Sequence, residues 1–198
     1  MCIRDSLVTI SGNPLLGPQW EPLGHVLMRL VEQLRRGGRF SVQTYGRKYN
    51  LSPDTSPYLQ AIVDEDGNVQ MEVSANLQVN PPLTEDQYNT LEFYGWTKPD
   101  SDPSEYSAEG GNPNFVRYFE PNTDALLVAE FILTTLIGVY EITEDDYFGF
   151  DHAAQANLVD SLHKLGRLKY SDGNPDRVIF AMPGKHLEQL ESKSNVSI

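Results

Sequence analysis

Five side chains that could bind a metal ion stand close together in the sequence, at Glu144, Asp145, Asp146, Asp151 and His152. Hard cations prefer carboxylate oxygens, so this group is the most enzyme-like feature of the chain. Adjacent acids in a loop are far more often simply solvated, because a charged carboxylate is stable in water. We therefore expect no metal and no other cofactor. A metal-dependent hydrolase is the last of the functions that we consider.

Other catalytic signatures are missing from the sequence. It contains no Gly-rich phosphate loop with a Lys, no G-x-S-x-G motif and no H-E-x-x-H motif. The histidines are scattered without metal-ligand spacing, at His25, His152, His163 and His186. Cys2 is the only cysteine, which excludes an intramolecular disulfide and a Cys-based zinc site. We predict that the protein is not an enzyme.

Aromatic side chains stand on both sides of a loop that is rich in Pro, Ser, Asp and Gly. They are Tyr94, Trp96, Phe115, Tyr118 and Phe119. One interpretation is that they cover the edge of a sheet. The other is that they line a groove into which a peptide docks, and these five residues are then the protein-binding site.

Two amphipathic or apolar helices are predicted from residue spacing. Apolar residues recur at three- and four-residue steps from Leu23 to Leu34 and again within Pro121–Ile142. The second helix, with Asp124 as a candidate N-cap, is apolar nearly all round, so we expect it to be buried on more than one side. Its length approaches that of a membrane span, but Glu130 near its middle argues against that interpretation.

The expected strands are Phe40–Tyr45, Tyr58–Val63, Val69–Val79 and Phe115–Glu120. The third alternates apolar and polar residues throughout, which is typical of an antiparallel strand with one face in water. Thr84 and Gln87 form a capping box that starts a short helix, and Gly95 ends it. The fold class is therefore α+β, with an antiparallel sheet packed against the first helix and the long central helix.

After residue 142 the sequence predicts an appendage to this domain. Thr143–Asp151 is acidic and aromatic, and we predict no helix or strand there. We predict a helix at Ala153–Leu165 and then a β-hairpin formed by Arg167–Tyr170 and Arg177–Met182. We divide the chain into a leader (1–19), a main domain (20–150) and a C-terminal helix and β-hairpin appendage with a polar tail (151–198). Residues 1–6, MCIRDS, resemble translated adapter sequence, and we expect them not to belong to the native protein.

Negative charge is concentrated in the middle of the chain. The net charge is −13, but residues 51–160 contain 21 acidic residues against Lys98 and Arg117 alone, a balance of −19. Such a field repels nucleic acid and anionic membranes and attracts a basic partner. We expect a protein partner with a basic surface, no nucleic acid and no membrane, although acidity that only aids solubility is also consistent. No signal peptide is visible, so we expect a cytoplasmic protein.

The apolar central helix also bears on association. It has more apolar surface than one sheet can cover, so we predict a homodimer that uses helix faces. The C-terminal appendage could instead cover that surface within one chain.

Two short motifs, in the order of the elements above, resemble those of a known family. Leu91-Glu92-Phe93-Tyr94-Gly95-Trp96-Thr97-Lys98-Pro99 fits L-x-x-x-G-W-x-x-P, and Asn112-Pro113-Asn114-Phe115 precedes the long helix that begins at Asp124-Ala125. Over residues 20–142 the chain is similar to the actinobacterial TY-Chap and YbjN-like family. The family usually has Trp beside the Asn of the second motif, where this chain has Phe115.

The resemblance implies the sandwich fold of type III secretion chaperones, which often dimerise and have no known enzymatic activity. It supplies no catalytic residues. The preferred function is thus a non-enzymatic, chaperone-like adaptor that binds an extended protein segment. The alternative is an immunity-type inhibitor, an acidic protein that caps the basic active site of a toxin by charge complementarity.

Overall fold

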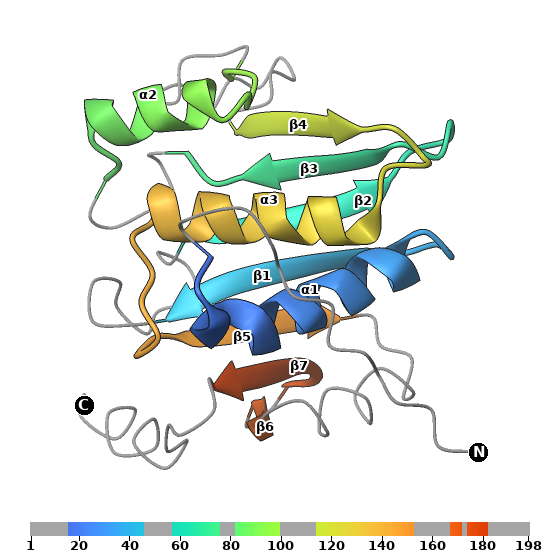
Figure 1. Cartoon of the computed structure of the whole chain (residues 1–198). Coiled ribbons are helices and arrows are strands. Elements are labelled where there is room, and N and C mark those ends of the chain that lie inside the picture. The colour runs from blue at the N-terminus through green and yellow to red at the C-terminus, as the bar shows by residue number, and fades with distance from the viewer. Residues whose placement is uncertain are drawn as a thin grey trace.

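A seven-stranded antiparallel sheet with two helices on one of its faces is the framework of the molecule (Figure 1). The computed structural model describes residues 16–45, 57–75, 82–99, 114–152, 167–171 and 174–181. In chain order the elements are a 3-10 turn η1 (Pro18–Trp20), α1 (Glu21–Leu34), β1 (Arg39–Tyr45), β2 (Tyr58–Val63), β3 (Val69–Val73), α2 (Glu85–Phe93), β4 (Phe115–Phe119), α3 (Ala125–Gly138), β5 (Tyr147–His152), β6 (Arg167–Ser171) and β7 (Asn174–Ala181). The strand order is β4-β3-β2-β1-β5-β7-β6, so the predicted α+β class is confirmed.

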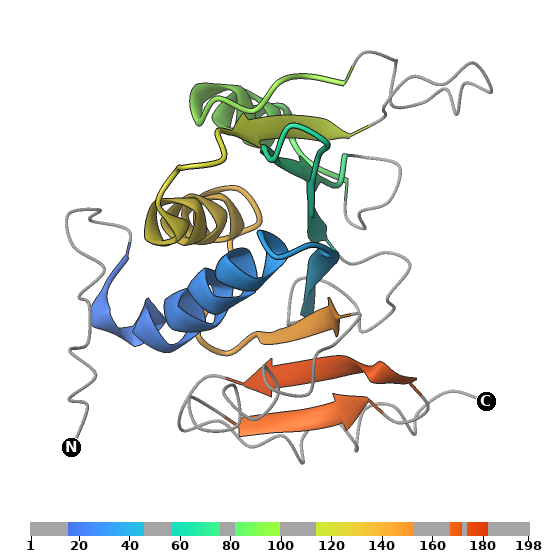
Figure 2. The ribbon, with the colours of Figure 1, turned by 90° about the vertical axis from the view of Figure 1, so that its right-hand side faces the viewer.

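Helices α1 and α3 lie side by side on the same face of the sheet (Figure 2). α1 starts with a proline in its first turn, where a missing N–H costs nothing, and its apolar stripe is buried. Gly37 and Gly38 follow it with φ of 105° and 123°, conformations that side chains with a Cβ avoid. α3 begins at the predicted cap, because the Asp124 carboxylate accepts a hydrogen bond of 2.8 Å from the Leu126 N–H.

The covered face of the sheet is a continuous apolar layer, since alternate residues of each strand point to it. One row crosses five strands through directly paired residues, and all of its members are buried: Phe115, Val73, Leu59, Val42 and Phe150. Each such side chain contributes about 1.5–3 kcal/mol on burial. This layer, with α1 and α3 above it, is the core.

Strand β3 is shorter than the alternation predicts. It ends at Val73, and Ser74, expected on the wet face, is fully buried. Its partner strand β2 begins at Tyr58, but the Ser74 carbonyl accepts a hydrogen bond of 3.0 Å from the Tyr140 hydroxyl instead of one from the Tyr58 N–H. The Ser74 hydroxyl accepts the last hydrogen bond, 3.2 Å from the Tyr58 N–H, while the Ser74 N–H donates to the Tyr58 carbonyl at 3.1 Å. Residues 76–79 of the predicted strand lie outside the described residues.

Strand β5 lies in a segment for which the sequence analysis predicted neither a helix nor a strand. It lies between β1 and β7 inside the sheet, and Phe148 and Phe150 are buried on the covered face. β7 pairs with β5 and β6 with β7, so the predicted hairpin is confirmed and continues the main sheet. The predicted helix 153–165, the tail and the leader up to residue 15 lie outside the described residues. The division of the chain near residue 150 stays a prediction.

Helix α3 is covered on several sides, as expected, but by different neighbours. The sheet and α1 cover two sides of α3. Hydrogen bonds join a third side to the α2 region, by which we mean α2 and the residues up to Thr97 that follow it. Most of the apolar surface that suggested a dimer is therefore covered within the chain. In the described parts of the chain, no helix is long and apolar enough to cross a membrane.

Candidate functional site

Strand β4 forms one edge of the sheet, and part of that edge has no partner among the described residues. Thr97 forms an isolated bridge to it, donating to the Val116 carbonyl at 2.8 Å and accepting from the Val116 N–H at 3.1 Å. Backbone groups of a strand alternate in direction, so the N–H and C=O of Tyr118 point the same way as those of Val116. No described residue pairs with them. The Tyr118 side chain is 56% exposed beside this edge.

The bridge stops at Thr97 because the chain before it turns into α2. Continued pairing would set Gly95 opposite Tyr118, but Gly95 has a φ of 87° and donates its N–H to the Glu92 carbonyl at 2.8 Å. The Gly95 carbonyl accepts 2.8 Å from Arg117 Nη1. A Cβ at this position would lie 2.9 Å from the same nitrogen, so glycine is needed both for φ and for space.

Two side chains fix the α2 region on α3. Gln87 completes the predicted capping box with Thr84, and its Nε2 donates to the Val139 carbonyl. Trp96, only 3% exposed, donates from Nε1 to Thr135 Oγ1 at 3.1 Å. Because buried polar groups are costly when unpaired, these bonds set where α2 and Thr97 lie relative to β4.

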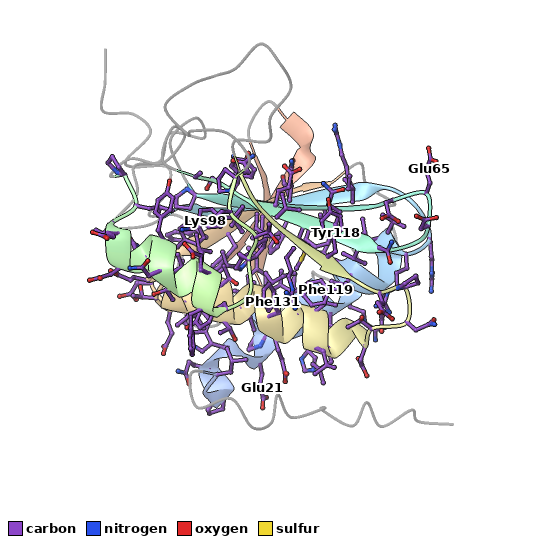
Figure 3. The ribbon with its side chains drawn as sticks, turned by 90° about the horizontal axis from the view of Figure 1, so that it is seen from above. Glu21, Glu65, Lys98, Tyr118, Phe119 and Phe131 are labelled. Carbon is purple, nitrogen blue, oxygen red and sulfur yellow. The ribbon has the colours of Figure 1, made fainter. Side chains whose placement is uncertain are left out.

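The five predicted site residues are divided by the structure. Phe115 is fully buried, with its ring 5.2 Å from that of Tyr88, and Trp96 is buried as described above, so both belong to the core. Tyr94 is half-buried against Gly138. Tyr118 and Phe119 lie on opposite sides of β4, with Phe119 on the side of α3 (Figure 3).

An apolar strip runs between β4 and α3, and we call its three members, Phe119, Leu127 and Phe131, the seam. The Phe119 and Phe131 rings meet edge to face at 5.1 Å. Leu127 lies one helical turn before Phe131 on the same side of α3 and is 57% exposed. Sequence reasoning did not assign Leu127 and Phe131 to a site. The sequence did contain a signal for them, because both residues lie outside the apolar stripe of α3 that was expected to be buried.

Arg117 lies among these aromatic rings without an acidic partner in the described residues. Its guanidinium carbon is 5.6 Å from the Phe119 ring centre and 5.8 Å from that of Phe131, within the range of cation–π attraction. Nη1 donates to Gly95, and the buried Nε has no hydrogen bond. Arg117 therefore holds the end of α2 against β4, and its charge is enclosed by rings.

Three carboxylates lie close to the seam residues along the chain. Glu120 follows β4, Asp124 caps α3, and both are exposed, while Glu130 precedes Phe131. Burial raises the pKa of Glu130, and the negative charge of Asp124 raises it further. The same region is therefore apolar at its centre and acidic at its rim.

The acidic β2–β3 turn adjoins this rim. A Cβ at Gly67 would lie 3.5 Å from Pro121, so the turn abuts the link between β4 and α3. Asp64 holds the turn, accepting from the N–H groups of Asp66 at 3.0 Å and Asn68 at 2.8 Å. The hydrogen bond from the Asn68 side chain is the main cause that lowers the pKa of Asp64. The neighbouring Glu65 and Asp66 are exposed.

Among the carboxylates at 144–146, that of Asp146 has a structural role. Asp146 is buried and accepts from the Thr143 N–H at 2.7 Å and from its hydroxyl at 3.2 Å, which closes the turn before β5. Asp151 and His152 belong to β5. Within the ranges that the structure describes, no three His, Cys, Asp or Glu side chains are grouped to hold a metal ion.

One protein family accounts for most of the chain. Its model, described as "T3SS (YopN, CesT) and YbjN peptide-binding chaperone 3" and abbreviated TY-Chap3, matches residues 15–154. The chain belongs to the TY-Chap3 family. No curated protein and no solved structure was found to match it.

The motifs that indicated the TY-Chap relationship have structural roles. Gly95 and Trp96 end α2 and anchor it to α3. In the second motif, Asn114 is buried, donates to the Tyr58 hydroxyl at 3.0 Å and accepts from the Ala75 N–H at 3.4 Å. These TY-Chap3 residues thus build and brace the β4 edge and leave Tyr118 and the seam at the surface.

Proposed function

We propose that this TY-Chap3 protein is a non-enzymatic, chaperone-like adaptor that binds an extended segment of another protein at the β4 edge. The family description names peptide binding. The observation that carries the proposal is the Tyr118 backbone, which points outward beyond the Thr97 bridge and has no partner among the described residues. A peptide in extended conformation adds to such an edge as a further strand.

The edge can give both affinity and selectivity. Each backbone hydrogen bond to Tyr118 contributes about 0.5–1.5 kcal/mol net. The exposed Tyr118 ring offers apolar area on the face of the sheet that no described helix covers (Figure 2). Natural edges left unpaired invite unwanted pairing, and the Thr97 bridge limits the open part of this edge to a short length.

The test compares two substitutions at one position. Tyr118→Pro removes the outward N–H, whereas Tyr118→Thr keeps it and removes only the ring; an edge strand tolerates proline at such a site. Reduced and alkylated lysozyme, a basic protein held unfolded, serves as the probe in fluorescence polarisation. We expect Tyr118→Pro to weaken binding about tenfold or more and Tyr118→Thr by less.

Amide hydrogen exchange adds a direct readout, because the Tyr118 N–H should exchange more slowly once the probe is bound. Equal binding by Tyr118→Pro and the unsubstituted protein, with unchanged exchange at Tyr118, would show that β4 is not the site. Circular dichroism of both variants controls for folding.

The acidic middle of the chain also supports the second candidate, an inhibitor of a basic toxin. An inhibitor recognises a folded basic surface, whereas an adaptor for extended segments needs an unfolded one. Folded lysozyme, which has the same sequence and charge as the probe apart from its alkylated cysteines, separates the two. Tight binding of the folded form would favour the inhibitor.

Two finer expectations accompany the proposal. The partner should be basic, so that binding weakens as salt screens the charge of −19 over about 8–10 Å. A homodimer, if formed, must use surface other than the buried side of α3. Light scattering at micromolar concentration distinguishes a dimer from the monomer mass of 22.3 kDa.

A further inference from the structure

We infer that the bound segment is basic and apolar in a fixed spacing, with an apolar side chain on the seam and a basic side chain two residues before it in the sequence. This inference rests on the proposed function, because it assumes that the segment pairs with β4. It names the chemical class of the segment and the surface that selects it.

Register places the apolar side chain. In an antiparallel pair, directly opposed residues have their side chains on the same face of the sheet. The residue opposite Tyr118 therefore points to the uncovered face, and its neighbour opposite Phe119 points toward α3. There it meets the seam, where the Phe119 and Phe131 rings are 5.1 Å apart and Leu127 is 57% exposed (Figure 3).

The exposure of Leu127 selects this spot among the apolar surfaces of α3. Most of the other large apolar residues of the helix are buried or half-buried against α1, the sheet or Trp96. The Trp96 ring packs on the Phe131 ring, and Leu127 lies one helical turn before Phe131 on the same side of α3. The α2 region does not extend as far as Leu127. An apolar side chain of the segment would cover Leu127 there.

Charge places the basic side chain. In an antiparallel segment, the residue two positions before the apolar one lies opposite Pro121. It is displaced by about 6.6 Å from Phe119 toward the start of α3, and its side chain is on the same face. Glu120 and Asp124 are exposed there, and Glu130 lies on the following turn of the helix. A lysine or arginine at this position would form ion pairs with these carboxylates, including Glu130, whose charge is disfavoured by burial.

Three cations in the described part of the chain already have partners, and one of them, Arg35, lies beside the rim at Thr123. Arg117 donates to Gly95, Arg35 donates to the Thr123 carbonyl, and Lys98 pairs with Glu92 at 2.6 Å. A second copy of the chain is a poorer occupant than a basic segment, since it brings a further net charge of −13 to an acidic rim. Charge complementarity thus favours a basic segment of another protein.

The experiment uses three labelled peptides and the full chain. The first is acetyl-Ser-Val-Thr-Lys-Thr-Leu-Thr-Lys-Thr-Val-Ser-amide, whose Leu and Lys side chains share a face when extended. The second replaces Leu by Asn, and the third replaces both Lys by Glu. We expect the first to bind at least about tenfold more tightly than either of the others by fluorescence polarisation.

Variants of the protein assign each preference to its surface. Leu127→Ser should abolish the preference for Leu over Asn, and the matched control Phe93→Ser, at an aromatic side chain that is 86% exposed on α2, should leave it intact. Asp124→Asn, which keeps a capping side chain, combined with Glu130→Gln should reduce the preference for Lys over Glu to about threefold or less.

The outcomes separate this inference from the proposed function. If all three peptides bind equally, and Tyr118→Pro weakens all of them, the β4 edge is the site but the segment class is wrong. If preferences appear but Phe93→Ser removes them as strongly as Leu127→Ser, the seam is not the selecting surface. If neither the peptides nor the unfolded probe bind, both proposals fail. Peptide affinity that falls with rising protein concentration would reveal a second copy as the occupant and overturn the inference.

Discussion

At the scale of single residues, the Glu130 carboxylate lies beside apolar side chains, where its negative charge is unfavourable. Glu130 adjoins Phe131 on α3, and burial followed by the charge of Asp124 raises its pKa above 4.5. A raised carboxylate pKa means that the protonated form is favoured by folding. The stabilisation from protonating Glu130 is therefore present below about pH 4.5, its unfolded value, and is lost as pH rises through the folded pKa.

This sign gives the first prediction, for Glu130→Gln. A neutral amide removes the unfavourable charge, so the variant should be more stable than the unsubstituted protein at pH 7, by less than about 1 kcal/mol. The gain should vanish below the unfolded pKa, where Glu130 is protonated in both states. Urea unfolding at several pH values measures it. A variant that is less stable at pH 7 would show that the carboxylate has a favourable partner.

Two glycines with similar backbone angles allow a matched comparison. Gly37 and Gly95 have φ of 105° and 87°, so alanine is strained at both positions, by about 1 kcal/mol or more. A Cβ at Gly37 meets nothing within 4 Å, whereas one at Gly95 lies 2.9 Å from Arg117 Nη1. Gly95→Ala should therefore lower the free energy of unfolding more than Gly37→Ala. Equal losses would mean that Arg117 moves aside at no cost.

At the scale of elements, local signals were sufficient for most helices and strands. α1, the capping box of α2 and the Asp124 cap of α3 follow from residue types at fixed positions, and the structure has each of them. The end of β3 could not be predicted, because it depends on where β2 begins and on Tyr140, whose hydroxyl donates to the Ser74 carbonyl from another segment. β5 was missed because its six residues include Gly149 and two ionisable side chains, although Phe148 and Phe150 alternate as strand residues do.

The docking of α2 on α3 yields a prediction at this scale. Thr135→Val removes the acceptor of the buried Trp96 N–H and should cost about 1–3 kcal/mol, the penalty of an unsatisfied buried donor. Thr134→Val is the control, because Thr134 is a half-buried neighbour whose hydroxyl donates to the Glu130 carbonyl in the same helix. Urea unfolding, monitored by tryptophan fluorescence, compares the free energies of unfolding of the two variants. Similar losses would assign no special role to the Trp96 hydrogen bond.

At the scale of the whole molecule, the sequence indicated the family more readily than the surface that we propose for binding. In the G-W and N-P-N-F motifs, the described residues Trp96, Asn114 and Phe115 are buried and brace the β4 edge. Aromatic clustering pointed to the neighbourhood of the proposed site but included Phe115 and Trp96, which are buried by tertiary packing. The Tyr118 backbone groups, which have no partner among the described residues, leave no signature in residue types, so this part of the proposed site could be found only from the strand order.

The division of the chain near residue 150 leads to the last prediction. The family match ends at residue 154, just after β5, yet β7 pairs with β5 and buries it from that side. Phe180 of β7 is fully buried, with its ring 6.5 Å from that of Phe150. A chain truncated after residue 154 keeps α1, α3 and five paired strands but exposes Phe148, Phe150 and the backbone edge of β5.

We expect the truncated chain to fold with its helices intact by circular dichroism but to unfold at lower urea concentration and to associate. The association follows because an open, apolar strand edge pairs with other chains. Phe180→Ala in the full chain is the control for the packing part alone and should cost about 3–5 kcal/mol without creating an edge. A truncated chain that is unfolded at all concentrations would place the hairpin within the folding unit, whereas one as stable and monomeric as the full chain would show that β5 does not depend on β7.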